Sequence, residues 1–362
     1  MSPKEHSPLI IDAHLDLSWN ALGWNRNLEQ AVAEIRRSEA DMQGKARGRN
    51  TVSLPEMRSG RIGICLATVL ARCNPAGRSS IDFRTQEAAC ATARGQLAYY
   101  RLLEERGLCR ILRSWSDLQA ACAAWHQGRY DEPLGFILSM EGADPIVSVG
   151  QAEEWYRDGL RAVGLAHYGP SAYAHGTGCE GPLTARGREL LPVLEELGVI
   201  LDLTHLADES FWEALELFRG TVIASHNNCR ALVPAQRQFS DDQIRAIIER
   251  GGVIGAAFDA WMLVPGWGAD NPQSPLVSLE SVAEHIDHIC QLSGNCSHIA
   301  IGSDLDGGFG TEQGPHDLDT IADLQAMGPV LSRRGYTEAD LAAIFHGNWM
   351  RIFEVAWAGS QS

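Results

Sequence analysis

Short apolar runs alternate with longer helical patterns along the chain, and this alternation predicts an α/β fold, a (β/α)8 barrel of TIM type. Several of the runs are apolar at every position, as expected for parallel strands that helices cover on both sides. Glycines directly follow several helical patterns, where a helix end favours a residue with positive φ. No G-x-G-x-x-G motif follows the first run, so the pattern fits a barrel better than two dinucleotide-binding halves.

The expected elements follow one another in a regular order, which we interpret as a single domain over residues 1–362. The eight predicted strands are residues 9–16, 62–69, 134–141, 160–167, 199–205, 221–226, 252–258 and 298–304. The helices predicted between them are residues 85–106, 116–127, 151–158, 184–197, 208–218, 240–250 and 278–292. Two C-terminal helices, at residues 318–333 and 338–358, are expected to close the ring.

Two segments interrupt the alternation of strands and helices. Residues 18–60 form a long connection after the first predicted strand, and the second predicted strand follows it. Residues 260–277 are rich in proline, glycine and tryptophan, which is typical of an irregular loop. Because barrel enzymes carry their chemistry on loops at one rim, we expect the second segment to lie over the mouth of an active site.

The composition excludes several classes of protein. Hydrophobic residues make up 45% of the chain and charged residues 21%, which is ordinary for a globular protein with a large core. The formal net charge of −16 argues against binding to nucleic acid or to an anionic membrane. No secretory signal or membrane-spanning run is visible, and none of the nine cysteines forms a C-x-x-C pair. We therefore expect reduced thiols and a cytoplasmic location, and we leave a homodimer open.

Polar side chains able to bind metals or transfer protons occur where six of the predicted strands end. These residues are His14, Asp16, Glu141, His167, His205, His226 and Asp304. Each alone has an ordinary explanation, such as a solvated histidine or a carboxylate at a helix end. Their repeated placement at the carboxyl ends of barrel strands, where barrel enzymes carry their active sites, predicts a functional site at this rim.

Imidazole nitrogens and carboxylate oxygens are suitable ligands for zinc and similar divalent ions. The set is larger than one tetrahedral ion needs, so it favours two ions about 3.5–4 Å apart that share one carboxylate and one hydroxide. Asp12 lies two residues before His14 on the same strand face. It either orients the metal ligands or is a buried, hydrogen-bonded carboxylate, and both readings stay open.

Other polar residues fit the site less well. Four histidines are expected on solvated surfaces: His126, His285, His288 and His346. His175 lies in a glycine-rich loop and could approach a ligand, although a structural role is the more ordinary interpretation. Asp306 precedes a glycine pair, so we expect it to brace a turn.

Ordered motifs over most of the chain resemble the membrane (renal-type) dipeptidases, binuclear zinc peptidases of the amidohydrolase-like barrels. The matching stretches are DAHLD, SMEGAD, GLRAVGLAH, GPLTARGRELLPVLEELGVILDLTH, TVIASHNNCRAL, QRQFSDDQI and HIAIGSDLDGG. They extend from residue 12 to about residue 308, and a similar helical tail follows through HGNWMRIFE. Each motif alone would be weak evidence, but their shared order makes the resemblance specific.

The resemblance implies a two-zinc site. His14 and Asp16 would bind one ion, His205 and His226 would bind the other, and Glu141 would bridge them.

It also implies three residues that act on the substrate. His167 would contact the carbonyl of the scissile bond, and Arg237 would bind the C-terminal carboxylate of the substrate through its guanidinium. Without the resemblance, a surface ion pair would be the ordinary interpretation of Arg237. Asp304 would take a proton from the bridging water and pass it to the leaving amine.

The expected function is hydrolysis of small dipeptides by attack of a metal-bridging hydroxide, and the family's tolerance allows a D-residue at the C-terminal position. One stretch departs from the family pattern: HYGPSAYAHGTG, residues 167–178, stands where an asparagine-containing stretch usually shapes the substrate pocket. Two alternatives stay open for this reason. The first is a barrel hydrolase acting on another amide or a lactone, and the second is a non-catalytic metal-binding relative.

Overall fold

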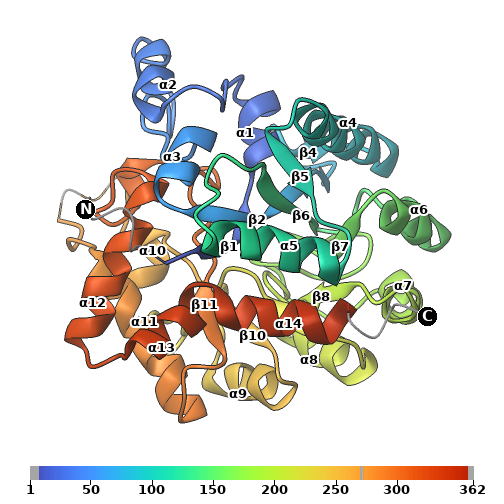
Figure 1. Cartoon of the computed structure of the whole chain (residues 1–362). Helices are drawn as coiled ribbons and strands as arrows, with labels where there is room; N and C mark the ends of the chain where they lie inside the picture. The colour runs from blue at the N-terminus through green and yellow to red at the C-terminus, as the bar shows by residue number, and fades with distance from the viewer. Residues whose placement is uncertain (1–7, 270, 272, 358–362) are drawn as a thin grey trace.

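The computed structural model describes residues 8–269, 271 and 273–357 and forms a barrel of parallel strands (Figure 1). The eight strands follow one another around the ring in chain order, and every pairing between them is parallel. The strands are β1 (Ile10–Leu15), β2 (Ile62–Leu70), β6 (Leu134–Glu141), β7 (Leu160–Gly164), β8 (Ile200–Asp202), β9 (Val222–Ala224), β10 (Val253–Ala256) and β11 (Ile299–Ile301). The predicted fold class is confirmed, although the later strands are shorter than expected.

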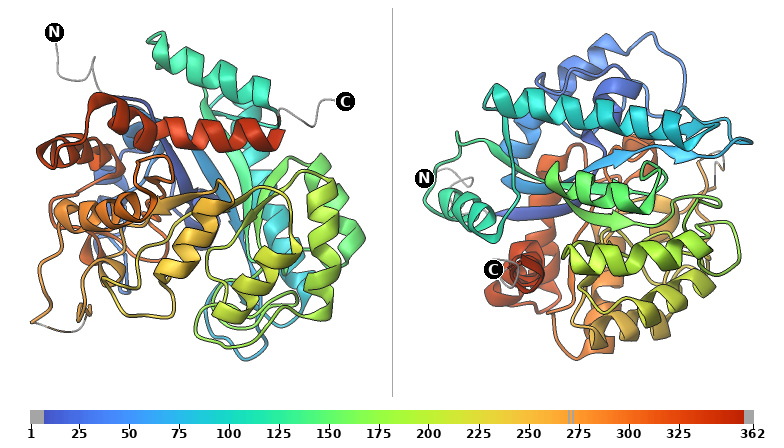
Figure 2. Two further views of the ribbon diagram at one scale, coloured as in Figure 1. Left: turned by 90° about the horizontal axis from the view of Figure 1, so that it is seen from below. Right: turned by 90° about the vertical axis from the view of Figure 1, so that its right-hand side faces the viewer.

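Helices surround the ring, as two further views show (Figure 2). Those predicted between the strands are α4 (Gln86–Glu105), α5 (Trp115–His126), α6 (Ala152–Arg157), α7 (Ala185–Glu196), α8 (Asp208–Leu217), α9 (Asp241–Glu249) and α11 (Leu279–Ser293). Side-chain caps fix several of their starts. Ser240, for example, accepts a hydrogen bond from the backbone N–H of Gln243 in a capping box, which satisfies donors that the first turn of α9 leaves free.

Each of the two C-terminal helices predicted from the sequence is divided. The first consists of a 3-10 helix, η4 (Ile321–Ala326), followed by α12 (Met327–Arg333). The second consists of α13 (Glu338–Ala342), a π-helical turn η5 (Ala343–Gly347) and α14 (Asn348–Trp357). The periodic apolar pattern continues through these changes of winding, which explains why the sequence predicts uninterrupted helices.

Several short elements were not predicted. The segment 18–60 contains α1 (Leu17–Gly23), α2 (Val32–Ser38) and α3 (Leu54–Ser59), and the second loop segment begins with α10 (Ala260–Leu263). After β2, the strands β3 (Arg72–Cys73) and β4 (Asp82–Phe83) form a small parallel sheet, and β5 (Cys109–Ile111) pairs in parallel with the first residues of β6. Elements this short have too few residues for a detectable period.

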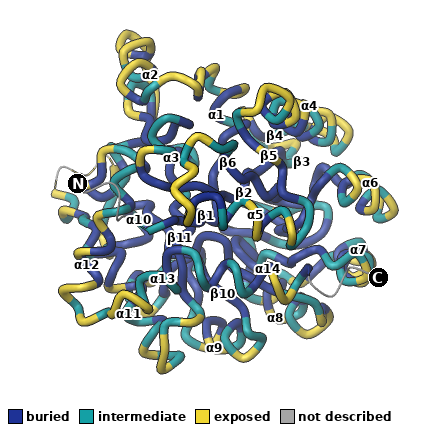
Figure 3. Tube along the Cα trace, in the orientation of Figure 1, coloured by how far each residue is buried: buried dark blue, intermediate teal, exposed yellow. Residues whose placement is uncertain are grey.

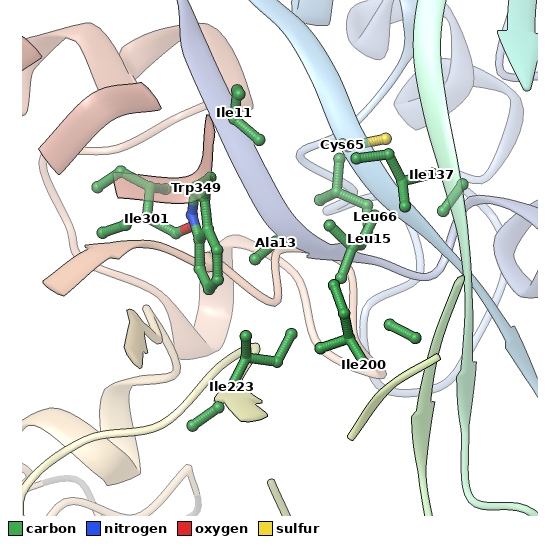
Figure 4. Close-up of a cluster of buried hydrophobic side chains, with 14 of the residues drawn as sticks. Ile11, Ala13, Leu15, Cys65, Leu66, Ile137, Ile200, Ile223, Ile301 and Trp349 are labelled. Atoms are coloured by element: carbon green, nitrogen blue, oxygen red, sulfur yellow. The ribbon is translucent and has the colours of Figure 1, made fainter. Parts of the chain in front are cut away.

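The barrel strands are the most deeply buried part of the molecule (Figure 3). A cluster of apolar side chains from strands around the ring packs with Trp349 of α14 (Figure 4). The indole N–H of Trp349 donates to the backbone oxygen of Ile301 at 2.9 Å, so the C-terminal helix is fixed directly to β11. No helix within the described ranges is both long and apolar enough to cross a membrane. All nine cysteines are free thiols.

Candidate metal centre and active site

The seven predicted strand-end residues converge on one rim of the barrel. His14 lies within β1, Asp16 follows that strand, and Glu141 is the last residue of β6. The other four lie two or three residues beyond the ends of β7, β8, β9 and β11, as His167, His205, His226 and Asp304. These strands therefore end two or three residues earlier than predicted.

Backbone conformation explains two of these shorter strands. His205 has φ of 68° and Asp304 has φ of 59°, a region that a β-strand does not enter. Few residues other than glycine adopt it, because the side chain approaches its own backbone. Strain of this kind is typical of residues that a functional site holds in place.

Glu141 lies at the centre of the histidines. Its Oε2 atom is 3.6 Å from Nε2 of His14. Its Oε1 atom is 3.2 Å from Nε2 of His205, 3.4 Å from Nε2 of His226 and 3.7 Å from Nε2 of His167. One oxygen of this carboxylate thus faces His14, and the other faces three histidines: His167, His205 and His226.

A second group of side chains surrounds His14. Its Nε2 atom lies 3.8 Å from Oδ2 of Asp16 and 3.8 Å from Oδ1 of Asp304. Within the described part of the chain, Nε2 of His14 and Oδ1 of Asp16 are buried without a hydrogen-bond partner. Buried polar atoms are normally paired, so these two indicate a ligand that the protein side chains do not supply.

The donor set fits divalent metal ions. Three groups of side chains bring one ligand atom each to within 4.8 Å of one another: His14, Glu141 and His226; Glu141, His167 and His205; and His14, Asp16 and Asp304. Neighbouring imidazole and carboxylate ligands of this kind are typical of zinc and related ions.

Hydrogen bonds to the far side of the imidazole rings fix their orientation. Nδ1 of His205 is 2.9 Å from the Thr177 hydroxyl, which itself donates to the backbone oxygen of His205 at 3.3 Å. Thr177 therefore accepts the Nδ1 proton, and Nε2 of His205 keeps its lone pair. Nδ1 of His226 is 2.9 Å from the hydroxyl of Ser225.

Asp12 is a buried, hydrogen-bonded carboxylate that joins β1 to β11. It accepts hydrogen bonds from the backbone N–H and the hydroxyl of Ser303, at 2.9 and 2.5 Å, and from the backbone N–H of His14 at 3.2 Å. Because His14 follows on β1 and Asp304 follows Ser303, this carboxylate holds two of the rim residues in register.

The electrostatics of the metal-free rim favour uptake of positive charge. Burial raises the pKa of Asp304 well above its usual range and that of Glu141 to about 7. Burial opposes protonation of His14, but the carboxylates of Glu141 and Asp16 outweigh it and raise the pKa of His14 to about 10. Burial lowers the pKa of three other histidines well below its usual range: His167, His205 and His226. Neutral imidazoles are the form that binds metals.

The rim opens into a small cavity of about 90 Å³. Arg237 lines it and is only 4% exposed. Its Nη1 atom donates to Oδ1 of Asn227 and its Nη2 atom to the backbone oxygen of His226, both at 2.8 Å. Arg237 therefore does not form the surface ion pair that would be its ordinary interpretation without the resemblance. Two of the five guanidinium donors are held by the protein, which orients the group within the cavity wall.

Residues that the sequence did not single out also line the cavity, among them Trp19 of α1, Tyr168, Asp259 and Met262 of α10. Asp259 is buried, and both its oxygens accept hydrogen bonds from Nε2 of Gln313, at 2.8 and 2.9 Å. Tyr168 packs its ring against those of His167 and His205. Asp259 directly follows the predicted seventh strand, so the same strand-end rule that selected Asp304 could have found it.

Among the remaining polar residues, the expectations for His285 and Asp306 are wrong, whereas His175 has the structural role that was the more ordinary interpretation. His285 is fully buried on α11, where its ring contacts the backbone N–H of Cys229 and the backbone oxygen of Leu263. His175 lies outside the cavity wall, with Nδ1 2.8 Å from the backbone oxygen of Pro182. The side chain of Asp306 accepts hydrogen bonds from the backbone of Thr51 and Val52, so it joins two distant segments instead of bracing its own turn.

The other three histidines that were expected on solvated surfaces are exposed or half-buried. His288 is half-buried, with Nε2 2.8 Å from Oδ1 of Asp241. His126 is exposed and its ring meets that of the half-buried His346.

Curated relatives align with most of the chain at 26–29% identity. The chain is 29% identical over 273 residues to an uncharacterized protein of the pqqA 5′ region in Klebsiella pneumoniae. This alignment covers 72% of this chain and 95% of that protein. It is 26% identical over 309 residues to the dipeptidase tcpJ of Claviceps purpurea, which covers 83% of this chain and 68% of the relative.

Solved structures share the fold. The dipeptidase AC, a metallopeptidase, superposes with a TM-score of 0.80 at 24% identity, over 97% of this chain and 99% of the other. A Rhodobacter sphaeroides metallopeptidase, liganded with a phosphinate mimic of the dipeptide L-Ala-D-Ala, superposes with a TM-score of 0.76 at 22% identity, over 97% and 100%. The sequence also matches the membrane dipeptidase family model over residues 4–361. The chain belongs to this family of metallo-dipeptidases, peptidase family M19.

Proposed function

We propose that this enzyme hydrolyses the peptide bond of small dipeptides with two divalent ions, most favourably zinc. The observation that carries the proposal is the position of Glu141, one of whose oxygens faces His14 while the other faces His205 and His226. His14 and Asp16 would hold one ion, His205 and His226 the other, and Glu141 both. When bound, such ions act as Lewis acids and lower the pKa of a coordinated water.

Asp304 is the proposed general base and acid. Its side chain lines the cavity and lies 3.8 Å from His14, beside the proposed ligands. A carboxylate at this position can accept a proton from the attacking water and donate it to the amine that leaves. His167 lines the same cavity, and we propose that its Nε2 atom donates a hydrogen bond to the oxygen of the scissile carbonyl.

Arg237 is the proposed recognition site for the C-terminal carboxylate of the substrate. Its guanidinium is buried in the cavity wall, where a charge-assisted hydrogen bond is stronger than in water. A cavity of about 90 Å³ suits a small substrate. The dipeptide mimic held by the Rhodobacter sphaeroides relative carries a D-residue at its second position, which supports a D-residue at that position here.

The alternatives explain fewer of these features. An amidohydrolase-type enzyme acting on another amide or a lactone would use the buried guanidinium of Arg237 only for a substrate that carries a free carboxylate. A non-catalytic relative would not need Asp304 in the cavity in addition to the ligand set. We also propose that residues 1–362 form one catalytic domain, supported by a family match that extends over residues 4–361.

Two measurements test the proposal. Metal analysis of the purified protein is expected to give two divalent ions per chain. A screen of L,L-, L,D- and D,L-dipeptides with the zinc-loaded enzyme is expected to give turnover for free dipeptides and much less for tripeptides. A metal-loaded enzyme that cleaves lactones or other amides but no dipeptide would favour the first alternative, and bound metal without any hydrolysis would favour the second.

A further inference from the structure

The histidines at the rim differ in what contacts their Nδ1 atoms. His205 and His226 have hydroxyl groups there, from Thr177 and Ser225. His167 instead has a guanidinium: Nη1 of Arg72 lies 3.3 Å from Nδ1 of His167. This difference determines which ring nitrogen carries the proton in each neutral imidazole.

A hydroxyl can accept a proton from Nδ1, but a guanidinium can only donate one. Arg72 therefore requires a lone pair on Nδ1 of His167, and the neutral ring must carry its proton on Nε2. A ring with its proton on Nε2 donates a hydrogen bond from that atom and cannot use it as a metal ligand. His205 has the opposite arrangement, because Thr177 accepts its Nδ1 proton.

Arg72 is paired with a buried carboxylate. Its Nη2 atom forms an ion pair with Oδ1 of Asp82 at 2.6 Å, and its Nη1 atom also donates to the backbone oxygen of Tyr168 at 3.3 Å. Arg72 and Asp82 are directly paired in the small sheet of β3 and β4, with side chains 12% and 3% exposed. This excursion after β2 brings the guanidinium to the far side of the His167 ring.

The start of the excursion is fixed as well. The side chain of Gln96 on α4 exchanges two hydrogen bonds with the backbone of Leu70, the last residue of β2, at 2.7 and 2.9 Å. Arg72 follows two residues later, so its backbone position is set by the barrel and not by a free loop.

We propose that Arg72, anchored by Asp82, is a positioning residue that fixes His167 as the Nε2–H tautomer. His167 then serves as a hydrogen-bond donor to the carbonyl oxygen of the substrate, not as a third ligand beside Glu141 and His205. The inference rests on the proposed function for its catalytic consequence, whereas the tautomer is a property of the protein itself.

The direct test is nitrogen NMR of the ring atoms of the protein labelled with ¹⁵N-histidine, with and without zinc. The His167 signals are assigned from their loss in His167→Gln. We expect Nε2 to be protonated and Nδ1 to be unprotonated in both forms of the wild-type protein. A proton on Nδ1, or a shift of Nε2 on zinc binding that is typical of metal ligation, would overturn the proposal, and this measurement needs no variant of Arg72.

Kinetics test the consequence. Arg72→Met keeps an unbranched apolar side chain but removes the guanidinium and its donors, so the His167 signals should change to a mixture of tautomers. Substituting a residue that orients an active-site side chain typically lowers activity by about 10–100-fold. We expect this loss in kcat, whereas KM and zinc content should change by less than about threefold. Arg84→Met, an exposed arginine next to β4, is the matched control and should retain wild-type values.

A merely structural role for Arg72 would change KM, zinc content or thermal unfolding together with kcat, and unchanged kcat would equally contradict the proposal. Should Arg72→Met fail to fold, Asp82→Asn keeps Arg72 but removes the charge that anchors it. This variant is expected to give a smaller loss in kcat, again with little change in KM and zinc content. An enzyme with the Nε2–H tautomer but no dipeptidase activity would refute the proposed function and leave the role of Arg72 on the tautomer intact.

Discussion

The two sides of the cavity are built differently. The proposed metal side comes from strands or the residues that directly follow them, and its five side chains are each at most 8% exposed. The substrate side comes from loops: the excursion that contains β3 and β4, the segment of residues 167–178, and the turn after β10. Tyr168 on this side is 40% exposed. The comparison indicates that the sheet fixes the chemistry, whereas the loops shape what can bind.

The loops are nevertheless tied to one another. The carboxylate of Asp144, just after β6, accepts hydrogen bonds from the backbone N–H groups of Cys73 and Ala172, both at 2.8 Å. Gly176 packs so closely that a Cβ atom there would lie 1.9 Å from the backbone oxygen of His167. The segment 167–178 thus has a defined conformation beside the site, which is what a pocket wall requires.

The largest effect is expected on the metal side, from Glu141→Gln. The amide keeps the shape of the side chain but presents only one oxygen to the two groups of histidines and no negative charge. We expect loss of bound metal and of all measurable dipeptidase activity. Metal analysis and turnover are compared with Glu153→Gln, an exposed glutamate on α6 that should behave as wild type. Full metal content in Glu141→Gln would show that Glu141 is not a ligand.

The next largest effect is expected from Asp304→Asn, which separates chemistry from metal binding. General acid–base catalysis contributes about 10²–10⁴ in rate, so kcat should fall by about 10²-fold or more while both metals and the fold are retained. Metal analysis and circular dichroism check retention. Turnover close to that of the wild type would mean that another group transfers the proton.

Arg237→Met tests the boundary between the two sides. A buried, charge-assisted hydrogen bond contributes about 1.5–3 kcal/mol, which corresponds to a loss of roughly 10–150-fold in kcat/KM for free dipeptides. Metal content should not change. The loss should largely disappear for dipeptides whose C-terminus is amidated, because these lack the carboxylate. Equal losses for acid and amide would make Arg237 a structural residue and favour the broader amide or lactone hydrolase.

The same division explains what the sequence could predict. The barrel and the residues of the metal side could be predicted because most of the apolar runs end in a histidine or a carboxylate. This signal lies within one short stretch of sequence for each of these strands. Arg72 was not predicted because β3 has only two residues and its partner Asp82 lies ten residues further along the chain. His285 was expected to be solvated because its surroundings, Cys229 and Leu263, come from other parts of the chain.

The smallest effects are expected within the segment 167–178. Two of its aromatic side chains, Tyr168 and His175, have different surroundings. Tyr168 lines the cavity, and loss of its partly buried ring in Tyr168→Ala should cost about 1 kcal/mol of substrate binding, or about fivefold in kcat/KM.

His175 is the matched control from the same segment. Its ring nitrogen contacts the backbone oxygen of Pro182 away from the cavity, so His175→Ala should lower the free energy of unfolding by about 1 kcal/mol and change kcat/KM by less than about twofold. Thermal unfolding and steady-state kinetics with a panel of dipeptides compare the two variants. We expect only Tyr168→Ala to alter the ranking of substrates, since only its side chain belongs to the pocket wall. If His175→Ala changed that ranking as strongly, the whole segment would act as one recognition element, and the distinction between its inner and outer faces would be wrong.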